Sequence, residues 1–158
     1  MSTYHHGELR PALLSAAAKI LEKKGRDAIS LRDLARRAGV SHNAPYRHFA
    51  DRQALLAALA EEGFALLAAA LESKPWREQA MAYLRFGLAN PERFKLMFTR
   101  PVPAALRRFV EGDAVAQATW AMVHGLTVLI LAGHFAGEDP EALLGETLAA
   151  VRFVQRSA

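Results

Sequence analysis

Apolar residues recur every three or four positions along the first part of the chain. Between Glu8 and Lys24 they form one stripe, which indicates an amphipathic helix. Pro11 falls in the first turn, where a helix tolerates its missing N–H group, and Gly25 follows the last turn. We therefore expect a helix from Glu8 to Lys24 whose core face consists of Leu9, Leu13, Ala16, Ala17, Ile20 and Leu21.

Two short helices joined by a tight turn are predicted next. Ser30 begins a Ser-x-x-Asp capping pattern, and the first helix runs to about Ala38. Gly39 can supply the positive φ of the turn, and Ser41 is placed to cap a second helix, His42 to Phe49. Two short helices around a glycine-containing turn are typical of a helix-turn-helix unit.

The remainder of the chain predicts only helices, so the expected fold class is all-α. Their starts and ends follow from caps, prolines and glycines. We expect a helix-turn-helix domain over residues 1–50 and a helical domain over residues 51–158. The predicted helices of the latter are Asp51 to about Glu72, Glu78 to Leu88, one begun by Asn90 and broken at Pro101, Ala104 to Val110, Ala114 to about Gly137, and one from Asp139 to about Arg156.

The composition is that of a globular protein. The chain has 158 residues, of which 52% are apolar and 23% charged, enough to bury a core. The absence of cysteine excludes disulfides, thiolate metal sites and cysteine nucleophiles. The start lacks the apolar stretch of a secretory signal, and polar residues interrupt the charge-free stretch Ala114 to Gly137. We expect that stretch to be a buried helix, with no membrane span, in a cytoplasmic protein.

Positive charge is concentrated at the start of the chain. The net charge is +4, yet residues 1–52 hold ten Lys and Arg against five Asp and Glu, whereas residues 53–158 hold ten against eleven. No acidic residue lies between Leu34 and Ala50. The second short helix would turn Ala44 and Phe49 inward and expose side chains that suit base edges and phosphates, namely His42, Asn43, Tyr46, Arg47 and His48. This pattern favours a nucleic acid as the partner.

Four motifs of this region resemble the DNA-binding domain of the TetR family of transcriptional regulators. They are Tyr4-His5-His6-Gly7, Ser30-Leu31-Arg32-Asp33-Leu34-Ala35, Ala38-Gly39-Val40-Ser41 and Ala44-Pro45-Tyr46-Arg47-His48-Phe49. The resemblance covers about residues 4–60, and its spacing agrees over three successive helices. It implies an all-helical homodimer that places one recognition helix per subunit, here His42 to Phe49, in the major groove of a palindromic double-stranded DNA operator.

Position by position, the resemblance implies a set of DNA contacts. Ser30 and Ser41 are interpreted as caps first and contacts second, and Arg52 falls at the usual basic phosphate contact. Pro45 would set the shape of the recognition helix or touch a thymine methyl group. The full predicted set is Ser30, Arg32, Ser41, His42, Asn43, Pro45, Tyr46, Arg47, His48 and Arg52.

The second half resembles the TetR subfamily with a Trp-His-Gly motif, on Asn90-Pro91-Glu92-Arg93-Phe94 and on Trp120, His124 and Gly125. The resemblance implies a small-molecule effector, expected to be hydrophobic, and a dimer interface formed by the last two helices. Trp120 and His124 share a helix face, where they either line a pocket or form a satisfied core pair. The predicted pocket residues are Phe64, Leu67, Phe86, Phe94, Met97, Phe98, Trp120 and His124, and the predicted interface residues are Leu126, Leu129, Ile130, Gly133, Leu144, Leu148 and Val151.

The sequence thus predicts a ligand-responsive repressor. The alternatives are a helical interaction module with a basic face and an enzyme. The chain has no P-loop, no GxGxxG motif and no nucleophile with a base at a suggestive spacing, so neither catalysis nor a metal or cofactor is expected. Steep weakening by salt would distinguish a DNA reader from an interaction module.

Overall fold

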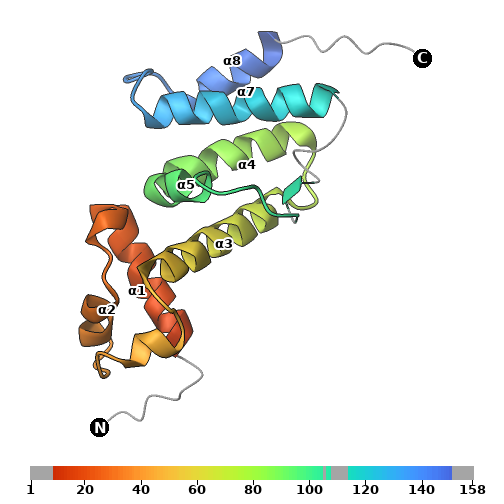
Figure 1. The fold of residues 1–158 in the computed structure, drawn as a ribbon. Coiled ribbons are helices and arrows are strands. Elements are labelled where there is room, and N and C mark those ends of the chain that lie inside the picture. Colours follow the sequence, from red (N-terminus) through yellow and green to blue (C-terminus); the bar gives the residue numbers. More distant parts are fainter. Residues whose placement is uncertain (1–8, 105, 108–113, 151–158) are drawn as a thin grey trace. The chain divides into compact units, whose positions relative to one another are not determined.

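Helices are the only regular elements in the part of the chain that the computed structural model describes, residues 9–104, 106–107 and 114–150 (Figure 1). This confirms the all-α prediction. The motif Tyr4-His5-His6-Gly7, most of the helix Ala104 to Val110, and the last helix beyond Ala150 lie outside the described residues. The elements are α1 (Leu9–Lys24), η1 (Arg26–Ala28), α2 (Leu31–Arg37), η2 (Ala44–Arg47), α3 (Arg52–Leu71), α4 (Trp76–Ala89), α5 (Pro91–Met97), α7 (Ala114–Leu131) and α8 (Pro140–Ala150), where η marks a 3-10 helix.

The chain divides into two compact units. The N-terminal unit comprises Met1–Phe64 and Asn90–Pro101, and the second unit comprises Ala65–Ala89 and Val102–Ala158. Helix α3 begins in the N-terminal unit and ends in the second one, whereas α5 belongs to the N-terminal unit although the chain on either side of it belongs to the second.

The core of the N-terminal unit is built on the predicted apolar stripe of α1. Leu13 and Leu21 are completely buried, and α1 packs against α2, η2 and α5. Leu34 of α2 and Leu55 and Leu59 of α3 are also completely buried. Each such leucine contributes about 1.5–3 kcal/mol relative to an exposed one, so these contacts fix the short helices on α1.

In the second unit α4, α7 and α8 pack against one another. Both α7 and α8 contact α4, and they also contact each other. The core side chains Tyr83, Leu84, Val123 and Leu144 are at most 4% exposed. The predicted cap of the last helix is confirmed, because the Asp139 carboxylate accepts the backbone N–H of Glu141 at 3.0 Å.

Helix α7 corrects the prediction of a long buried helix from Ala114 to Gly137. It ends at Leu131, and only Val123 and Thr127 on it are buried. It ends early because Gly133 adopts a φ of 84° and the N–H of His134 donates to the carbonyl of Leu129, a Schellman termination. By length and composition alone, α3 and α7 could each cross a membrane, a test that core helices of soluble proteins also pass.

Candidate nucleic-acid interface

Helix α2 and the turn after it are shaped by Gly39. The N–H of Gly39 donates to the carbonyl of Arg36, and the N–H of Val40 donates to that of Ala35, so the helix closes as a Schellman motif. Gly39 has a φ of 66°, and a Cβ there would meet nothing within 4 Å. Its backbone conformation, rather than lack of space, therefore makes glycine the suitable residue, as the sequence predicted.

The segment after this turn, residues 41–49, is less regular than the predicted helix His42 to Phe49. Only Ala44–Arg47 form a helix, and it is a 3-10 helix. Hydrogen bonds at a spacing of three residues, typical of a 3-10 helix, join Ala44 N–H to Ser41 and His48 N–H to Pro45. The α-helical spacing of four appears where Phe49 N–H also donates to the carbonyl of Pro45. The prediction was wrong in helix type and length, but it placed a helical turn correctly.

Two residues anchor this segment in the unit. Pro45 is buried, and Phe49 is 3% exposed beneath the guanidinium of Arg10, which lies 5.3 Å from its ring centroid. The inward position of Phe49 was predicted. Burial of Pro45 corrects the suggestion that it touches a thymine methyl group, because a buried ring cannot reach a base edge.

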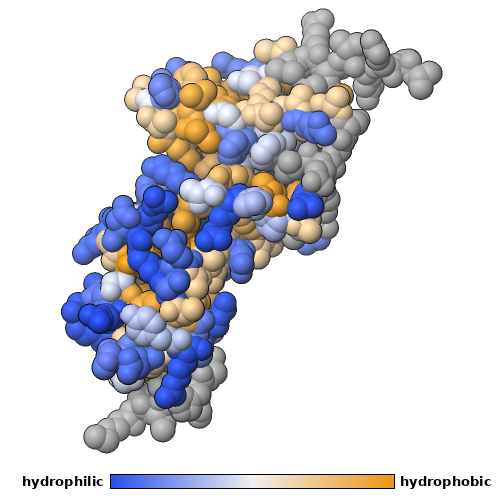
Figure 2. All heavy atoms as spheres, viewed as in Figure 1, coloured by the Kyte–Doolittle hydropathy of each residue, from blue (hydrophilic) through white to orange (hydrophobic). Residues whose placement is uncertain are grey.

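The other side chains of the segment face outward. Ser41, His42, Asn43, Arg47 and Tyr46 are exposed, Tyr46 to 44%, and His48 is half-buried. Arg32 and Ser30 at the start of α2 are also exposed. Figure 2 shows hydrophilic side chains gathered over the N-terminal unit. The structure thus exposes hydrogen-bonding, aromatic and cationic groups on a stretch that contains no carboxylate.

The caps of this region differ in part from the prediction. Ser30 occupies the N-cap position of α2 with an extended backbone, but its side chain makes no capping hydrogen bond. Asp33 instead pairs with Arg36 and, at 2.6 Å, with Arg37. The hydrogen bond from Arg37 is the largest cause that lowers the pKa of Asp33. Desolvation opposes it, and the positive charges of both arginines lower the pKa further. Asp51 caps α3 as predicted, since its carboxylate accepts the N–H of Ala54 at 2.7 Å.

Arg52 makes contacts that the sequence did not indicate. Its Nη2 donates to the carbonyl of Arg26 at 2.6 Å and lies 3.1 Å from the Asp27 carboxylate, and its Nε donates to the carbonyl of Ile29 at 3.1 Å. The guanidinium therefore joins the start of α3 to η1, an element that the sequence analysis missed. No local sequence pattern predicts this link, because the partners of Arg52 are backbone carbonyls more than twenty residues away.

The predicted effector-pocket residues fall into two packed sets, one in each unit. In the N-terminal unit Phe98 meets Phe64 edge-on at 5.5 Å and Phe94 at 4.8 Å between centroids, beside the fully buried Met97. In the second unit Leu67 is fully buried, Phe86 is half-buried, and Trp120 stacks on His124 at 5.2 Å.

His124 belongs to a hydrogen-bonded group in the second unit. Its Nδ1 lies 2.8 Å from the hydroxyl of Tyr83, and Trp120 also hydrogen-bonds to Tyr83. Burial raises the pKa of Tyr83 and lowers that of His124, so the phenol stays protonated, the imidazole stays neutral, and a hydrogen bond joins the two side chains. Of the two alternatives left open by the sequence, these contacts favour a satisfied core histidine.

The predicted dimer residues do not all lie on a free face. Leu144 and Leu148 are 1% and 2% exposed inside the second unit, which places them in its core. Leu126 and Ile130 are half-buried, whereas Leu129 is 43% exposed and Gly133 is exposed. Val151 lies outside the described residues.

Among the described residues no group of three or more His, Asp or Glu is placed to hold a metal ion.

The geometry of the N-terminal unit is that of a helix-turn-helix DNA-binding protein. Two short helical elements flank a glycine turn, and polar and basic side chains face outward.

Comparison with known proteins identifies the family. The sequence profile of the bacterial regulatory proteins of the TetR family matches residues 13–59. The chain is 32% identical over 121 residues, 77% of its length, to the HTH-type transcriptional repressor Rv1474c of Mycobacterium tuberculosis, and it spans 61% of that repressor. Residues 13–59 are therefore a TetR-family DNA-binding domain, and the chain around them resembles a transcriptional repressor.

Solved structures agree in fold. A protein of unknown function from Rhodococcus sp. RHA1 is 36% identical, with a TM-score of 0.78 over 93% of this chain and 95% of the other. The regulator BioQ, solved with its double-stranded DNA operator, is 25% identical, with a TM-score of 0.59 over 94% of this chain and all of the other.

Proposed function

We propose that this chain is a transcriptional repressor that binds a palindromic DNA operator as a homodimer and responds to a small, hydrophobic effector. The observation that carries the DNA-binding part is the anchoring of segment 41–49. Burial of Pro45 and Phe49 leaves the polar side chains between and before them exposed together. Repression is supported by the relative from Mycobacterium tuberculosis, and operator binding by the likeness to BioQ with its DNA.

The exposed side chains of segment 41–49 and of the start of α2 suit both the reading of base edges and the binding of phosphates. Asn43 can donate to and accept from an adenine edge, and the histidines can read base edges in the major groove. Arg32 and Arg47 carry the positive charge that phosphates attract. Since no carboxylate lies between Leu34 and Ala50, nothing in that stretch repels the DNA backbone.

The exposed apolar face of α7 supports dimerisation. Val128 and Leu129 on α7 are each 43% exposed, and contiguous apolar surface of this kind marks interaction sites. A second copy of the chain is the occupant that a palindromic operator requires, because one two-fold axis then relates both the subunits and the half-sites.

Effector response and cytoplasmic location are supported by the family alone. The aromatic residues predicted to line a pocket are in contact with one another within each unit, so an effector among them would have to displace side chains. Such an effector would act by binding better to the conformation that does not bind DNA. A regulator of DNA acts where the DNA is, in the bacterial cytoplasm.

The experiment that tests the proposal is selection from a randomised duplex library at near-physiological salt, with the bound sequences read out. Enrichment of one palindrome is expected, and affinity for it should fall steeply as salt is raised. Binding without any preferred sequence would contradict the proposal and favour an interaction module with a basic face. The enriched palindrome would also supply the operator for the experiments below.

A further inference from the structure

Helix α5 is attached to the N-terminal unit by a carboxylate from another helix. Both carboxylate oxygens of Glu22 on α1 accept backbone N–H groups of α5, from Glu92 at 3.1 Å and from Arg93 at 2.9 Å. These N–H groups follow the N-cap residue Asn90 and Pro91, and a side chain at the N-cap commonly meets them. Here Glu22, 70 residues earlier in the chain, takes that role.

Arg93 links the same helix to α3. Its side chain is buried, and its Nη1 donates to Glu62 on α3 at 3.2 Å. Its Nε is buried without a hydrogen-bond partner, which carries a desolvation cost. A buried, incompletely satisfied guanidinium persists only where its surroundings hold it in place. Arg93 therefore connects three helices, its backbone to α1 and its side chain to α3.

Helix α5 packs so closely on α3 that there is no room for a side chain at Gly63. A Cβ at this position would lie 2.7 Å from Sδ of Met97 and 3.1 Å from Cδ of Arg93. Because Met97 is completely buried, it has little space to move aside. The position of α5 is thus defined closely on its α3 side, next to the Glu62 contact.

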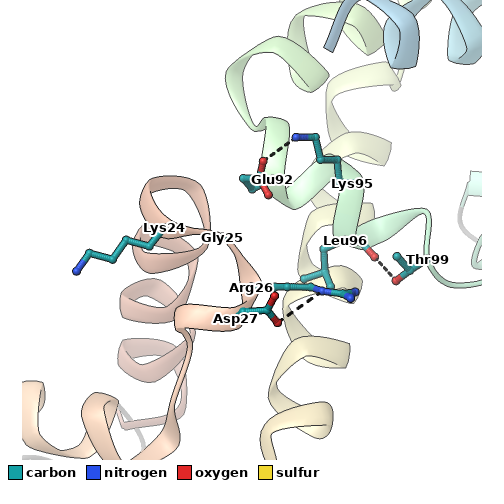
Figure 3. A pocket seen from close by; sticks show the side chains of 8 residues that line it. All are labelled: Lys24, Gly25, Arg26, Asp27, Glu92, Lys95, Leu96 and Thr99. Atoms are coloured by element: carbon teal, nitrogen blue, oxygen red, sulfur yellow. Dashed lines mark hydrogen bonds and ion pairs between the residues drawn. The ribbon is translucent and has the colours of Figure 1, made fainter. Parts of the chain in front are cut away.

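On its α1 side, α5 borders an open cleft of about 300 Å³. One wall consists of residues 24–27 and the other of Glu92, Lys95, Leu96 and Thr99 (Figure 3). The polar pairs among these residues each stay within one wall: Arg26 with Asp27, Lys95 with Glu92, and Thr99 with Leu96. None of these pairs crosses the cleft, whereas the two hydrogen bonds of Glu22 do join α1 to α5.

We propose that Glu22 is a positioning residue for DNA reading, which fixes α1 on α5 and so holds the reading segment 41–49 in its DNA-binding geometry. Helix α1 packs against α2 and η2, so a displacement of α1 moves the segment. The inference rests on the proposed function and names a residue outside segment 41–49 that positions it.

The test uses the full chain and compares Glu22→Ala with Glu61→Ala. Glu61 is exposed on α3, and its replacement removes the same charge. Two quantities are measured: the ratio of affinities for the selected operator and a random duplex, and hydrogen exchange of the Glu92 and Arg93 amides. We expect Glu22→Ala to lower the affinity ratio at least tenfold relative to Glu61→Ala, with loss of amide protection. Glu22→Gln should lie between, because its amide oxygen still accepts one N–H group.

Two results separate this inference from the proposed function. If Glu22→Ala exposes the two amides but keeps the affinity ratio of Glu61→Ala, the positioning role is refuted while operator binding stands. If the wild-type chain itself shows no preference for any duplex, the proposed function is refuted, and the inference is refuted as well because it depends on that function. Should Glu22→Ala not fold by circular dichroism, Glu22→Gln carries the same test, with a partial loss of the affinity ratio expected and a ratio equal to that of Glu61→Ala overturning the proposal.

Discussion

At the scale of single residues, exposure decides which side chains of segment 41–49 can read DNA. Pro45 and Phe49 hold the segment in place, and Asn43 and Arg47 are exposed beside them. An amide that both donates and accepts can distinguish one base pair from another, whereas a guanidinium on phosphate cannot. The two exposed residues are therefore expected to contribute differently to binding.

Asn43→Ala should erode sequence preference more than overall affinity. Loss of a bidentate base contact is expected to cost about 1–3 kcal/mol on the operator and little on random DNA. Arg47→Ala should weaken binding to both DNAs alike and reduce the salt dependence. Titration of each variant against both duplexes at several salt concentrations measures the difference. Equal losses on both DNAs for both variants would contradict this assignment.

Arg52 should act on stability rather than on phosphate. Because its Nε and Nη2 donate to the carbonyls of Ile29 and Arg26, Arg52→Lys is expected to lower the free energy of unfolding by about 1 kcal/mol. The slope of log affinity against log salt should stay unchanged in Arg52→Ala. The exposed Arg32 is the control, since Arg32→Ala should reduce that slope by about 0.9 if it contacts a phosphate, with unfolding unaffected. A reduced slope in Arg52→Ala would restore the phosphate contact implied by the family resemblance.

The environment of His124 predicts that stability falls in mild acid. Burial lowers the pKa of His124 from its ordinary value of 6.5, so the folded state favours the neutral ring. As the pH falls below about 6.5 the unfolded chain binds the proton first, and stability is lost progressively until the folded-state pKa is passed. His124→Asn should show a shallower loss between pH 7 and 5 in urea unfolding than the wild type. The exposed His134→Asn should follow the wild-type curve.

At the scale of elements, local patterns predicted what local interactions determine. The stripe of α1, the Gly39 turn and the Asp51 and Asp139 caps were predicted because each depends on residues within one or two turns. The 3-10 form of η2, the link from Arg52 to η1 and the link from Glu22 to α5 were missed. The 3-10 spacing of η2 occurs within an otherwise helical sequence, and both links join residues more than twenty positions apart.

Two glycines on helices should respond oppositely to alanine. Gly63→Ala places a methyl group against the buried Met97, and such overpacking is expected to destabilise the chain by about 1–3 kcal/mol. At Gly145 in α8 the nearest atom is Cε of Met81 at 3.7 Å, an ordinary contact. Gly145→Ala should therefore raise stability by about 0.5–1 kcal/mol through helix propensity. Thermal unfolding compares the two, and a neutral Gly63→Ala would show that α5 can shift away from α3.

At the scale of the whole molecule, α7 carries more apolar surface than the other described residues bury. Its charge-free sequence predicted a buried helix, yet most of α7 is only partly covered by the described residues, where its main contacts are with α4 and α8. Sequence periodicity cannot say whether an apolar residue meets its own chain or another. Leu144 and Leu148 illustrate this limit: predicted for an interface, they lie in the core, while Leu129 of the same prediction remains exposed.

If a second copy covers this face, one charge should be enough to separate the subunits. Leu129→Glu would place a carboxylate in that apolar interface at a cost of several kcal/mol, and a two-fold interface contains the change twice. We expect dimerisation to weaken at least about 100-fold, because each 1.4 kcal/mol corresponds to a factor of ten. The matched control is Leu66→Glu on α3, where the leucine is 49% exposed. Sedimentation should find a monomer for Leu129→Glu alone, with operator affinity lost in parallel; a Leu129→Glu dimer that still binds the operator would place the interface elsewhere.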